Sequence, residues 1–434
     1  MPARIDLGDP GFEQEFERFL GAKRETAGDV AGAVAAIIDQ VRERGDDALI
    51  ELTRRFDGFE LDAENLRLGE GEIKKARHDC SNDEIQALEL AAERISAFHA
   101  RQSPEDLEYR DEAGLRLGHR WRAIKSVGMY VPGGTAAYPS SVLMNALPAK
   151  VAGVSRLVMT APAPGGAFNP LVLTAAEIAG VDEIYRVGGA QAIAAMAMGT
   201  ESIQPVDKIV GPGNAYVAEA KRQLFGIVGI DMIAGPSEIL VVADGDNDPG
   251  WIAADLLSQA EHDSSAQAIL ITDDAGFADQ VLERIQAMLE SLPRKAIASE
   301  SWDRFGAVIL VGALSDAAPI IDAIAPEHLE LAMDGADELF AEIEHAGSVF
   351  LGRYAPEALG DYLAGPNHVL PTGRSARFSS GLGVLDFMKR TSFIGAGKAP
   401  VEKIGAAAVT LARAEGLHAH ALSVSLRLGQ TDPD

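Results

Sequence analysis

The sequence contains one cysteine, Cys80, among its 434 residues. A single thiol excludes an internal disulfide and any metal site built from several thiolates, and it fits a reducing compartment. A bound metal ion must therefore be held by histidine, carboxylate and amide ligands. The chain also lacks an apolar run approaching the ~18 residues of a membrane helix, and its first residues lack the basic and apolar regions of a secretory signal. We therefore expect a cytoplasmic protein without a membrane anchor.

Positive charge is scarce as well. Lysine and arginine number 38 against 65 aspartate and glutamate residues, which gives a formal net charge of −27. Such a surface repels the phosphates of nucleic acids and of anionic lipids. The densest group of basic residues, between Arg374 and Arg390, is interrupted by the segment FSSGLGVLDF. We therefore expect neither a nucleic acid nor a membrane as a partner.

Short apolar runs that end in glycine or proline alternate with helical segments through the middle of the chain. The runs VGMYVPGG, RLVMTAP, EIYRVGG and KIVGPGN come first, and EILVVAD, QAILITDD, AVILVG and SVFLGRY repeat the pattern after Ser237. This alternation is typical of βαβ units in a parallel sheet. It predicts an α/β fold with two Rossmann-like parallel-sheet domains in series, consistent with an old duplication, and with helical N-terminal and C-terminal segments.

The predicted boundaries divide the chain into four parts. Residues 1–120 form a mainly helical N-terminal region, and residues 121–236 form a first α/β domain on the cofactor side. Residues 237–375 form a second α/β domain with the candidate metal and catalytic residues, and residues 376–434 form a C-terminal loop and helical segment. That last segment has an apolar face but is too short to hold a core of its own. It must therefore pack on its own subunit or on a partner.

Neither of the common phosphate-binding motifs occurs in the chain. There is no G-x-G-x-x-G, since the segment GPGNAY has Tyr216 in place of the third glycine, and there is no G-x-x-x-x-G-K-[ST]. Open α/β sheets bind ligands beyond the carboxyl ends of their strands, where this chain places its glycines. Composition and spacing alone therefore leave the cofactor unidentified.

Polar residues interrupt the segment LLSQAEHDSSAQAILIT, residues 256–272, which predicts an amphipathic helix followed by a buried strand. Gln259 and His262 are three residues apart and share a face of a helical turn. With Asp361 and His420 they would make a mixed nitrogen and oxygen ligand set, which suits zinc or a similar divalent ion and leaves positions open for a substrate. The alternative is a helix end whose polar side chains face water, because each of these residues alone is more often solvated than bound to a metal.

The pair Glu327–His328, in the segment APEHLEL, has the composition of an acid–base site. A general base near neutral pH is most often histidine, and an adjacent carboxylate raises its pKa or activates water. An ordinary helix start after Pro326 would explain Glu327 well, but it leaves His328 unexplained.

Six segments in order resemble the histidinol dehydrogenase family: VGPGNAYVAEAKR, GIDMIAGPSEILVVAD, LLSQAEHDSSAQAILIT, IAPEHLEL, GDYLAGPNHVLPT and ARFSSGLGVLDFMKRTS. The similarity is dense from about Val127 to Ser392, resumes at EGLHAH, and is weak in residues 1–100. The resemblance implies a zinc-dependent enzyme of histidine biosynthesis. Such an enzyme oxidises L-histidinol to L-histidinaldehyde and then to L-histidine, with two NAD.

The resemblance also implies a role for each candidate residue. It makes Glu327 and His328 the acid–base pair. It implies one zinc ion per subunit, held by Gln259, His262, Asp361 and His420. These ligands and His328 also bind the substrate, together with Ser237, His368 and Glu415. The residues that match NAD-contacting positions are Tyr130, Gln191 and Asn214. The resemblance further implies a homodimer with shared active sites, in which the C-terminal segment crosses over and delivers Glu415 and His420 to the partner.

Three other functions use much of the same chemistry. A zinc- and NAD-dependent dehydrogenase of another small polar alcohol is disfavoured because Glu327, His328, His368 and Glu415 are all present. A zinc hydrolase would also combine a metal with glutamate and histidine, but it would turn over without NAD. A non-catalytic metal-binding protein would bind zinc without forming NADH, and it has no use for the Glu327–His328 pair.

Overall fold

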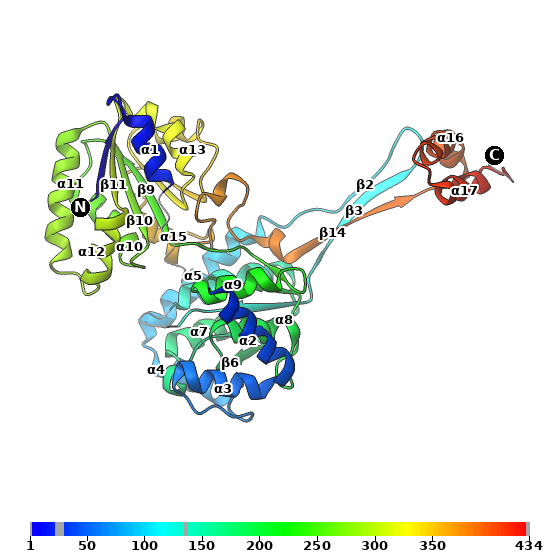
Figure 1. Cartoon of the computed structure of the whole chain (residues 1–434), viewed down its shortest axis with the longest axis horizontal. Helices are drawn as coiled ribbons and strands as arrows, with labels where there is room; N and C mark the ends of the chain where they lie inside the picture. Colours follow the sequence, from blue (N-terminus) through cyan, green and yellow to red (C-terminus); the bar gives the residue numbers. More distant parts are fainter. Residues whose placement is uncertain (1, 22–29, 134–137, 431–434) are drawn as a thin grey trace.

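The computed structural model describes residues 2–21, 30–133 and 138–430. These residues form two α/β lobes and a long arm, and Figure 1 shows the arm extending away from both lobes with the last two helices at its far end. Within the described ranges, no helix combines the length and the apolar character needed to cross a membrane.

The first lobe is built on a five-stranded parallel sheet with the strand order β6-β5-β4-β7-β8. Its strands are β4 (Ser126–Tyr130), β5 (Arg156–Thr160), β6 (Glu183–Tyr185), β7 (Lys208–Val210) and β8 (Gly229–Ile230). Side chains alternate between the two faces, so that Met129 and Tyr130 enter different cores. One face packs against α4 (Glu70–Asp79), α5 (Asn82–Ala100), α6 (Pro139–Ala152) and α7 (Pro170–Ile178). The other face packs against α2 (Ala31–Arg44), α3 (Asp46–Asp57), α8 (Gly189–Met198) and α9 (Ala215–Leu224).

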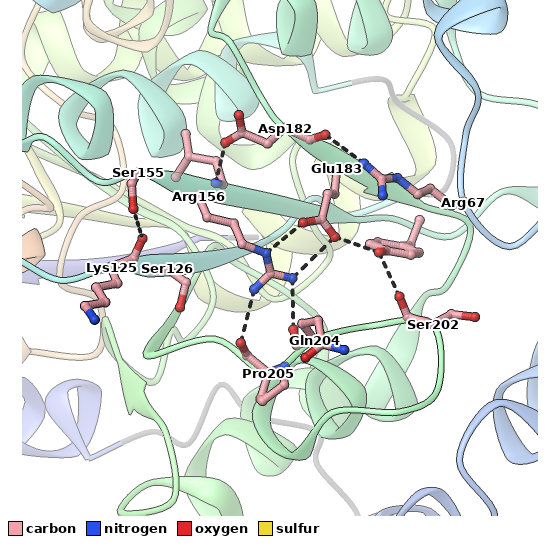
Figure 2. A network of polar contacts seen from close by, with 12 residues as sticks. Arg67, Lys125, Ser126, Ser155, Arg156, Asp182, Glu183, Ser202, Gln204 and Pro205 are labelled. Atoms are coloured by element: carbon pink, nitrogen blue, oxygen red, sulfur yellow. Dashed lines mark hydrogen bonds and ion pairs between the residues drawn. The ribbon is translucent and has the colours of Figure 1, made fainter.

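A network of polar contacts closes the amino edge of the five-stranded sheet (Figure 2). Arg156, at the start of β5, donates to both carboxylate oxygens of Glu183, with an Nε–Oε1 distance of 2.7 Å. The same guanidinium donates to the carbonyl oxygens of Gln204 and Pro205. The Tyr185 hydroxyl lies 2.7 Å from Glu183 Oε2. Because the guanidinium and the carboxylate have partners inside the protein, this edge stabilises the fold.

The second lobe is built on a six-stranded parallel sheet with the order β1-β11-β10-β9-β12-β13. Its strands are β1 (Ala3–Asp6), β9 (Glu238–Ala243), β10 (Gln267–Thr272), β11 (Ala307–Leu310), β12 (His328–Ala332) and β13 (Ser348–Leu351). One face packs against α1 (Phe12–Leu20), α13 (Ala318–Ile324) and α14 (Ala336–Phe340). The other packs against α10 (Pro249–Ala260), α11 (Ala275–Leu289) and α12 (Lys295–Phe305), and α15 (Glu357–Tyr362) follows β13.

Both sheets have the same topology. If the strands of each α/β unit are numbered along the chain, both sheets read 3-2-1-4-5, and β1 adds to the β11 edge of the larger sheet. This order is expected of Rossmann-like units, so the predicted pair of parallel sheets in series is confirmed. The four-part division of the chain remains a prediction. Strand β1 belongs to the N-terminal region but pairs with residues about 300 positions later, which no local pattern reveals.

The arm is an antiparallel sheet of β2 (Leu107–Arg110), β3 (Arg116–Ala123) and β14 (Met388–Gly395), in the order β14-β3-β2. It carries α16 (Lys398–Ala414) and α17 (His418–Arg427), which pack against each other. The sequence pattern predicted only helix and loop here. Strand β14 has no buried face that would produce an alternating pattern, so its apolar spacing carries no strand signal. Short 3₁₀ turns lie at Pro164–Gly166, Leu314–Ala317, Ser375–Arg377 and Val384–Phe387.

Candidate active site

The predicted metal and catalytic residues, apart from His420, gather at the amino edge of the six-stranded sheet. His328 is the first residue of β12, and Glu327 directly precedes it. Helix α10 runs antiparallel to the strands and ends at this edge, with Gln259 in its last turn and His262 just beyond its end. Asp361 lies on α15, which packs against α10 and β12. Open α/β sheets usually bind ligands at the opposite, carboxyl edge, so this position is unusual.

His328 is buried and held through one ring nitrogen. Its Nδ1 lies 2.9 Å from the backbone carbonyl oxygen of Glu238 in β9, which assigns the proton to Nδ1. Its Nε2 is buried and has no hydrogen-bond partner among the described residues. Burial lowers the pKa of His328 to about 4, although the charge of Asp361 acts in the opposite direction. The ring is therefore neutral near pH 7 and offers the lone pair of Nε2 as a proton acceptor.

Two carboxyl groups of α15 lie beside His328. Glu357 Oε1 is 3.7 Å from His328 Nε2, and one ligand atom from each of His328, Glu357 and Asp361 lies within 4.8 Å of the others. Burial, followed by the charge of Asp361, raises the pKa of Glu357 to about 9. Burial also disfavours the charge of Asp361, but the hydrogen bond and charge of His368 outweigh it and lower the pKa of Asp361 to about 2. At neutral pH the pair therefore holds one proton, on Glu357.

Glu327 lies near the other nitrogen of the His328 ring, with its Oε2 3.6 Å from Nδ1. That oxygen accepts a hydrogen bond of 2.9 Å from the backbone N–H of Glu238. In return, the Glu238 carboxylate accepts from the backbone N–H groups of Glu327 and Gly373, at 3.3 and 3.0 Å. These reciprocal bonds fix the chain on both sides of the catalytic candidate.

Three buried polar atoms at this edge have no hydrogen-bond partner within the part of the chain that the structure describes. They are Gln259 Oε1, His328 Nε2 and Glu357 Oε1. An unpaired buried polar group costs about 1–3 kcal/mol and is rare in native proteins. Three such atoms on neighbouring elements are available to a metal ion or a ligand.

The two lobes meet at this site. His368 Nδ1 lies 3.1 Å from the backbone oxygen of Asp361 and 3.4 Å from its Oδ1, while Nε2 lies 3.3 Å from Ser141 Oγ on α6 of the first lobe. Asn367 donates to a backbone carbonyl of the same helix at 2.6 Å. A pocket of about 250 Å³ opens here, and its lining includes His328, Asp361 and His368. Since α6 follows β4, the carboxyl edge of the five-stranded sheet adjoins the amino edge of the six-stranded sheet.

The three predicted NAD-contacting residues lie at that carboxyl edge. Tyr130 ends β4, and its hydroxyl accepts a hydrogen bond of 3.2 Å from the backbone N–H of Gly189. Gln191 is buried in the first turn of α8. Asn214 caps α9, with its side-chain oxygen accepting from the backbone N–H groups of Tyr216 and Val217. The strand order reverses between β4 and β7, and ligands of open α/β sheets bind at such a switch point.

The remaining candidates differ in position. Ser237 directly precedes β9, at the same edge as His328. Glu415 directly follows α16 as its C-cap and His420 lies in α17, and both residues are exposed. Figure 1 shows these helices at the end of the arm, away from both lobes, so a single chain does not bring Glu415 and His420 to the other candidates.

Glu357 and Ser141 lie at the site but were not predicted from the sequence. Glu357 had a signal, because residues 355–357 repeat the Ala-Pro-Glu of residues 325–327. Ser141 had none, since α6 belongs to the other lobe and its polar residues look like ordinary positions of an apolar helix.

Two Rossmann-like lobes that meet at a buried neutral histidine and an ionised carboxylate define a two-lobed α/β enzyme. The sequence model of the family described as histidinol dehydrogenase matches residues 21–428. The chain is 62% identical over 431 residues to the histidinol dehydrogenase of Rhodospirillum rubrum, covering 99% of each. It is 60% identical over 428 residues to that of Ruegeria pomeroyi, again covering 99% of each. The crystal structure of histidinol dehydrogenase from Elizabethkingia anophelis matches with a TM-score of 0.94 at 37% identity, covering 99% of this chain and 98% of that one.

The chain belongs to the histidinol dehydrogenase family, and it is an NAD-dependent oxidoreductase. The resemblance deduced from the six sequence segments is thereby confirmed.

Proposed function

We propose that the protein oxidises L-histidinol to L-histidine through L-histidinaldehyde, passing one hydride to each of two NAD molecules. The observation that carries this proposal is the buried, unpartnered Nε2 of His328, which faces a pocket at the junction of the lobes in a chain of this family. A substrate with an imidazole, an amine and a hydroxyl group suits a site with a proton acceptor, an ionised carboxylate and unpartnered amide oxygen.

We infer that Gln259, His262, Asp361 and His420 hold one zinc ion per subunit. The donor set fits, because Asp361 is ionised and the Gln259 oxygen is buried without a partner among the described residues. Glu357 is a poorer ligand because burial keeps it protonated. When bound, the metal supplies a template that orients the nitrogens of the substrate.

His328 acts as the general base in both oxidations. The Glu238 carbonyl holds the proton on Nδ1, so Nε2 is the atom that removes the proton from the substrate hydroxyl as the hydride leaves. Glu327 handles water in the second half-reaction, in which the bound aldehyde is hydrated before it is oxidised. Ser237 and His368 contact the substrate, and Tyr130, Gln191 and Asn214 contact NAD at the adjoining edge of the first lobe.

We further propose that two chains form a homodimer in which each arm completes the partner's site with Glu415 and His420. Two-fold dimers are the commonest assembly of soluble proteins. The arm and its helices expose large apolar side chains that a monomer would leave in water: Leu107, Tyr109, Ile394, Ile404, Leu411 and Leu426. Helix α15, which carries Asp361, also exposes Leu359 and Tyr362.

The test is the absorbance of NADH when purified protein is mixed with L-histidinol and NAD. We expect two NADH for each histidinol consumed, no turnover without NAD, and loss of turnover in a chelator with recovery when zinc is restored. Turnover without NAD, or one NADH with an aldehyde as the final product, would overturn the proposal.

A further inference from the structure

A buried ion pair lies under the loop that follows β7 in the first lobe. Lys221 comes from the last turn of α9, and Asp231 directly follows β8. Their side chains are only 3% and 1% exposed, and the ammonium group contacts the Asp231 carboxylate directly. Burying two charges is costly, and a well-packed apolar pair would often stabilise a fold equally well. We therefore looked for a role of this ion pair other than stabilising the fold.

Both members of this pair bind the same residue, Gly211. Lys221 Nζ donates to the Gly211 carbonyl oxygen at 3.1 Å, and Asp231 Oδ2 accepts from the Gly211 N–H at 2.8 Å. Gly211 has a φ of +108°, and a Cβ placed on it would lie 2.1 Å from the backbone oxygen of Tyr130. Only glycine fits here. The ion pair thus holds the end of β7 in contact with the end of β4.

The clamped residue opens the segment Gly211-Pro-Gly-Asn214, which leads into α9. The Asn214 side chain caps that helix, and Lys221 returns from its last turn to the start of the segment. The buried ion pair therefore fixes the start of the loop, and the Asn214 cap fixes its end. Asp231 Oδ1 also accepts from the backbone N–H of Met232 at 2.7 Å, so the same carboxylate fixes the point where the chain leaves the first lobe.

We propose that Lys221 and Asp231 are positioning residues for the cofactor: their ion pair holds the Gly211–Asn214 loop against Tyr130 in the shape that binds NAD. The inference rests on the proposed contacts of Tyr130 and Asn214 with NAD. Neither charged group touches the cofactor in this account, because both are buried beneath the loop. Their effect is exerted through the backbone of Gly211.

The test compares variants of the zinc-loaded enzyme by direct titration with NADH, followed by its fluorescence. Lys221→Met removes the donor to the Gly211 carbonyl. It should weaken NADH binding and raise the KM for NAD by about 10-fold or more, because a lost hydrogen bond to a charged group is worth about 1.5–3 kcal/mol. The KM for histidinol and the zinc content should stay unchanged. Asp231→Asn keeps an acceptor for the Gly211 N–H, so its effect should be smaller.

Arg156→Met is the matched control, because it breaks an ion pair at the opposite edge of the same sheet. It should lower stability and leave NADH binding unchanged. If Lys221→Met fails to fold, the same NADH titration is made with Lys221→Gln and Asp231→Asn, which replace the buried charges by polar groups. Wild-type affinity in all folded variants, or equal weakening by the control, overturns the inference. A wild-type protein that binds no NADH would instead overturn the proposed function.

Discussion

The two sheets have the same strand order, but the polar side chains at their amino edges differ in whether their hydrogen bonds are completed within the protein. At the edge of the five-stranded sheet, Arg156 and Glu183 pair with each other and with neighbouring carbonyl oxygens (Figure 2). At the same edge of the six-stranded sheet, Gln259, His328 and Glu357 each keep a buried atom without a partner among the described residues. The polar groups of the first edge have their partners inside the protein, whereas three buried atoms of the second edge are available to a ligand. Repeated α/β units can therefore use one position for stability in one copy and for chemistry in the other.

The way in which the two lobes meet explains the unusual location of the candidate site. The carboxyl edge of the five-stranded sheet lies next to the amino edge of the six-stranded sheet, joined by the Ser141–His368 contact. A cofactor bound at the usual position in the first lobe, as proposed, would lie next to the candidate site at the less usual edge of the second lobe. Metal removal and substitutions at each edge measure whether the two amino edges differ as sharply in function as they do in hydrogen bonding.

Removal of the metal should have the largest effect. We expect a chelator to abolish turnover while the protein stays folded at room temperature, because both sheets have apolar cores of their own. Activity and circular dichroism measured on the same sample check this. Unfolding of the chelated protein at room temperature would mean that the six-stranded edge is also structural, and the contrast between the edges would disappear.

Substitution of His328, the proposed general base, should have the second-largest effect on turnover. His328→Asn should lower the rates of both oxidations by about 10²–10⁴-fold, because one nitrogen removes the proton in each. Glu327→Gln should slow mainly the oxidation of the aldehyde. Histidinol and histidinaldehyde supplied separately to each variant measure the two halves. Equal damage by Glu327→Gln to both halves would refute this division of roles.

Arg156→Met should have the opposite effect to the substitutions at the active site, because it should reduce stability and leave activity almost unchanged. It should lower the free energy of unfolding by about 1–3 kcal/mol, since it leaves the part-buried Glu183 carboxylate without its main partner, and should leave kcat within about twofold. Denaturant unfolding and steady-state assays give both numbers. A large loss of kcat without loss of stability would show that this edge also serves the reaction.

Glu357→Gln should have the smallest effect on turnover, and its effect should appear in the pH dependence of stability. Burial and the charge of Asp361 raise the pKa of Glu357 from 4.5 to about 9. A raised pKa means that its stabilising contribution is complete below about pH 4.5 and is lost as the pH rises towards 9. In the metal-free protein the variant should therefore lose less stability over that interval than the wild type. Parallel thermal unfolding profiles would contradict the assignment.

Much of the fold can be predicted from the sequence because its strands and helices have distinct local patterns of apolar residues. Strands such as Glu238–Ala243 and Gln267–Thr272 are wholly buried apolar runs, and their alternation with helices predicts two parallel sheets. The arm does not follow from any local pattern, because Met388–Gly395 pairs with residues 116–123 far away in the chain and buries neither face. Only its terminal helices were expected.

The site could be predicted in part for the same reason. Glu327 and His328 stand out because a helix start does not explain the histidine, and the structure indeed buries that histidine against a strand. The shift of Glu357 towards a protonated carboxyl, and the contact of His368 with Ser141, depend on which side chains meet after folding. The position of His420 depends on more than one chain in the proposed dimer.

The most direct test of the account mixes two inactive variants, His262→Asn and His420→Asn, after partial unfolding and reassembly. If the amino edge of the six-stranded sheet is completed by a partner's arm, each heterodimer has one site with both lesions and one intact site. NADH formation from histidinol should then return to about half of the wild-type activity per heterodimer. Heterodimers that form but remain inactive would show that the ligands come from one chain, which would contradict the shared site.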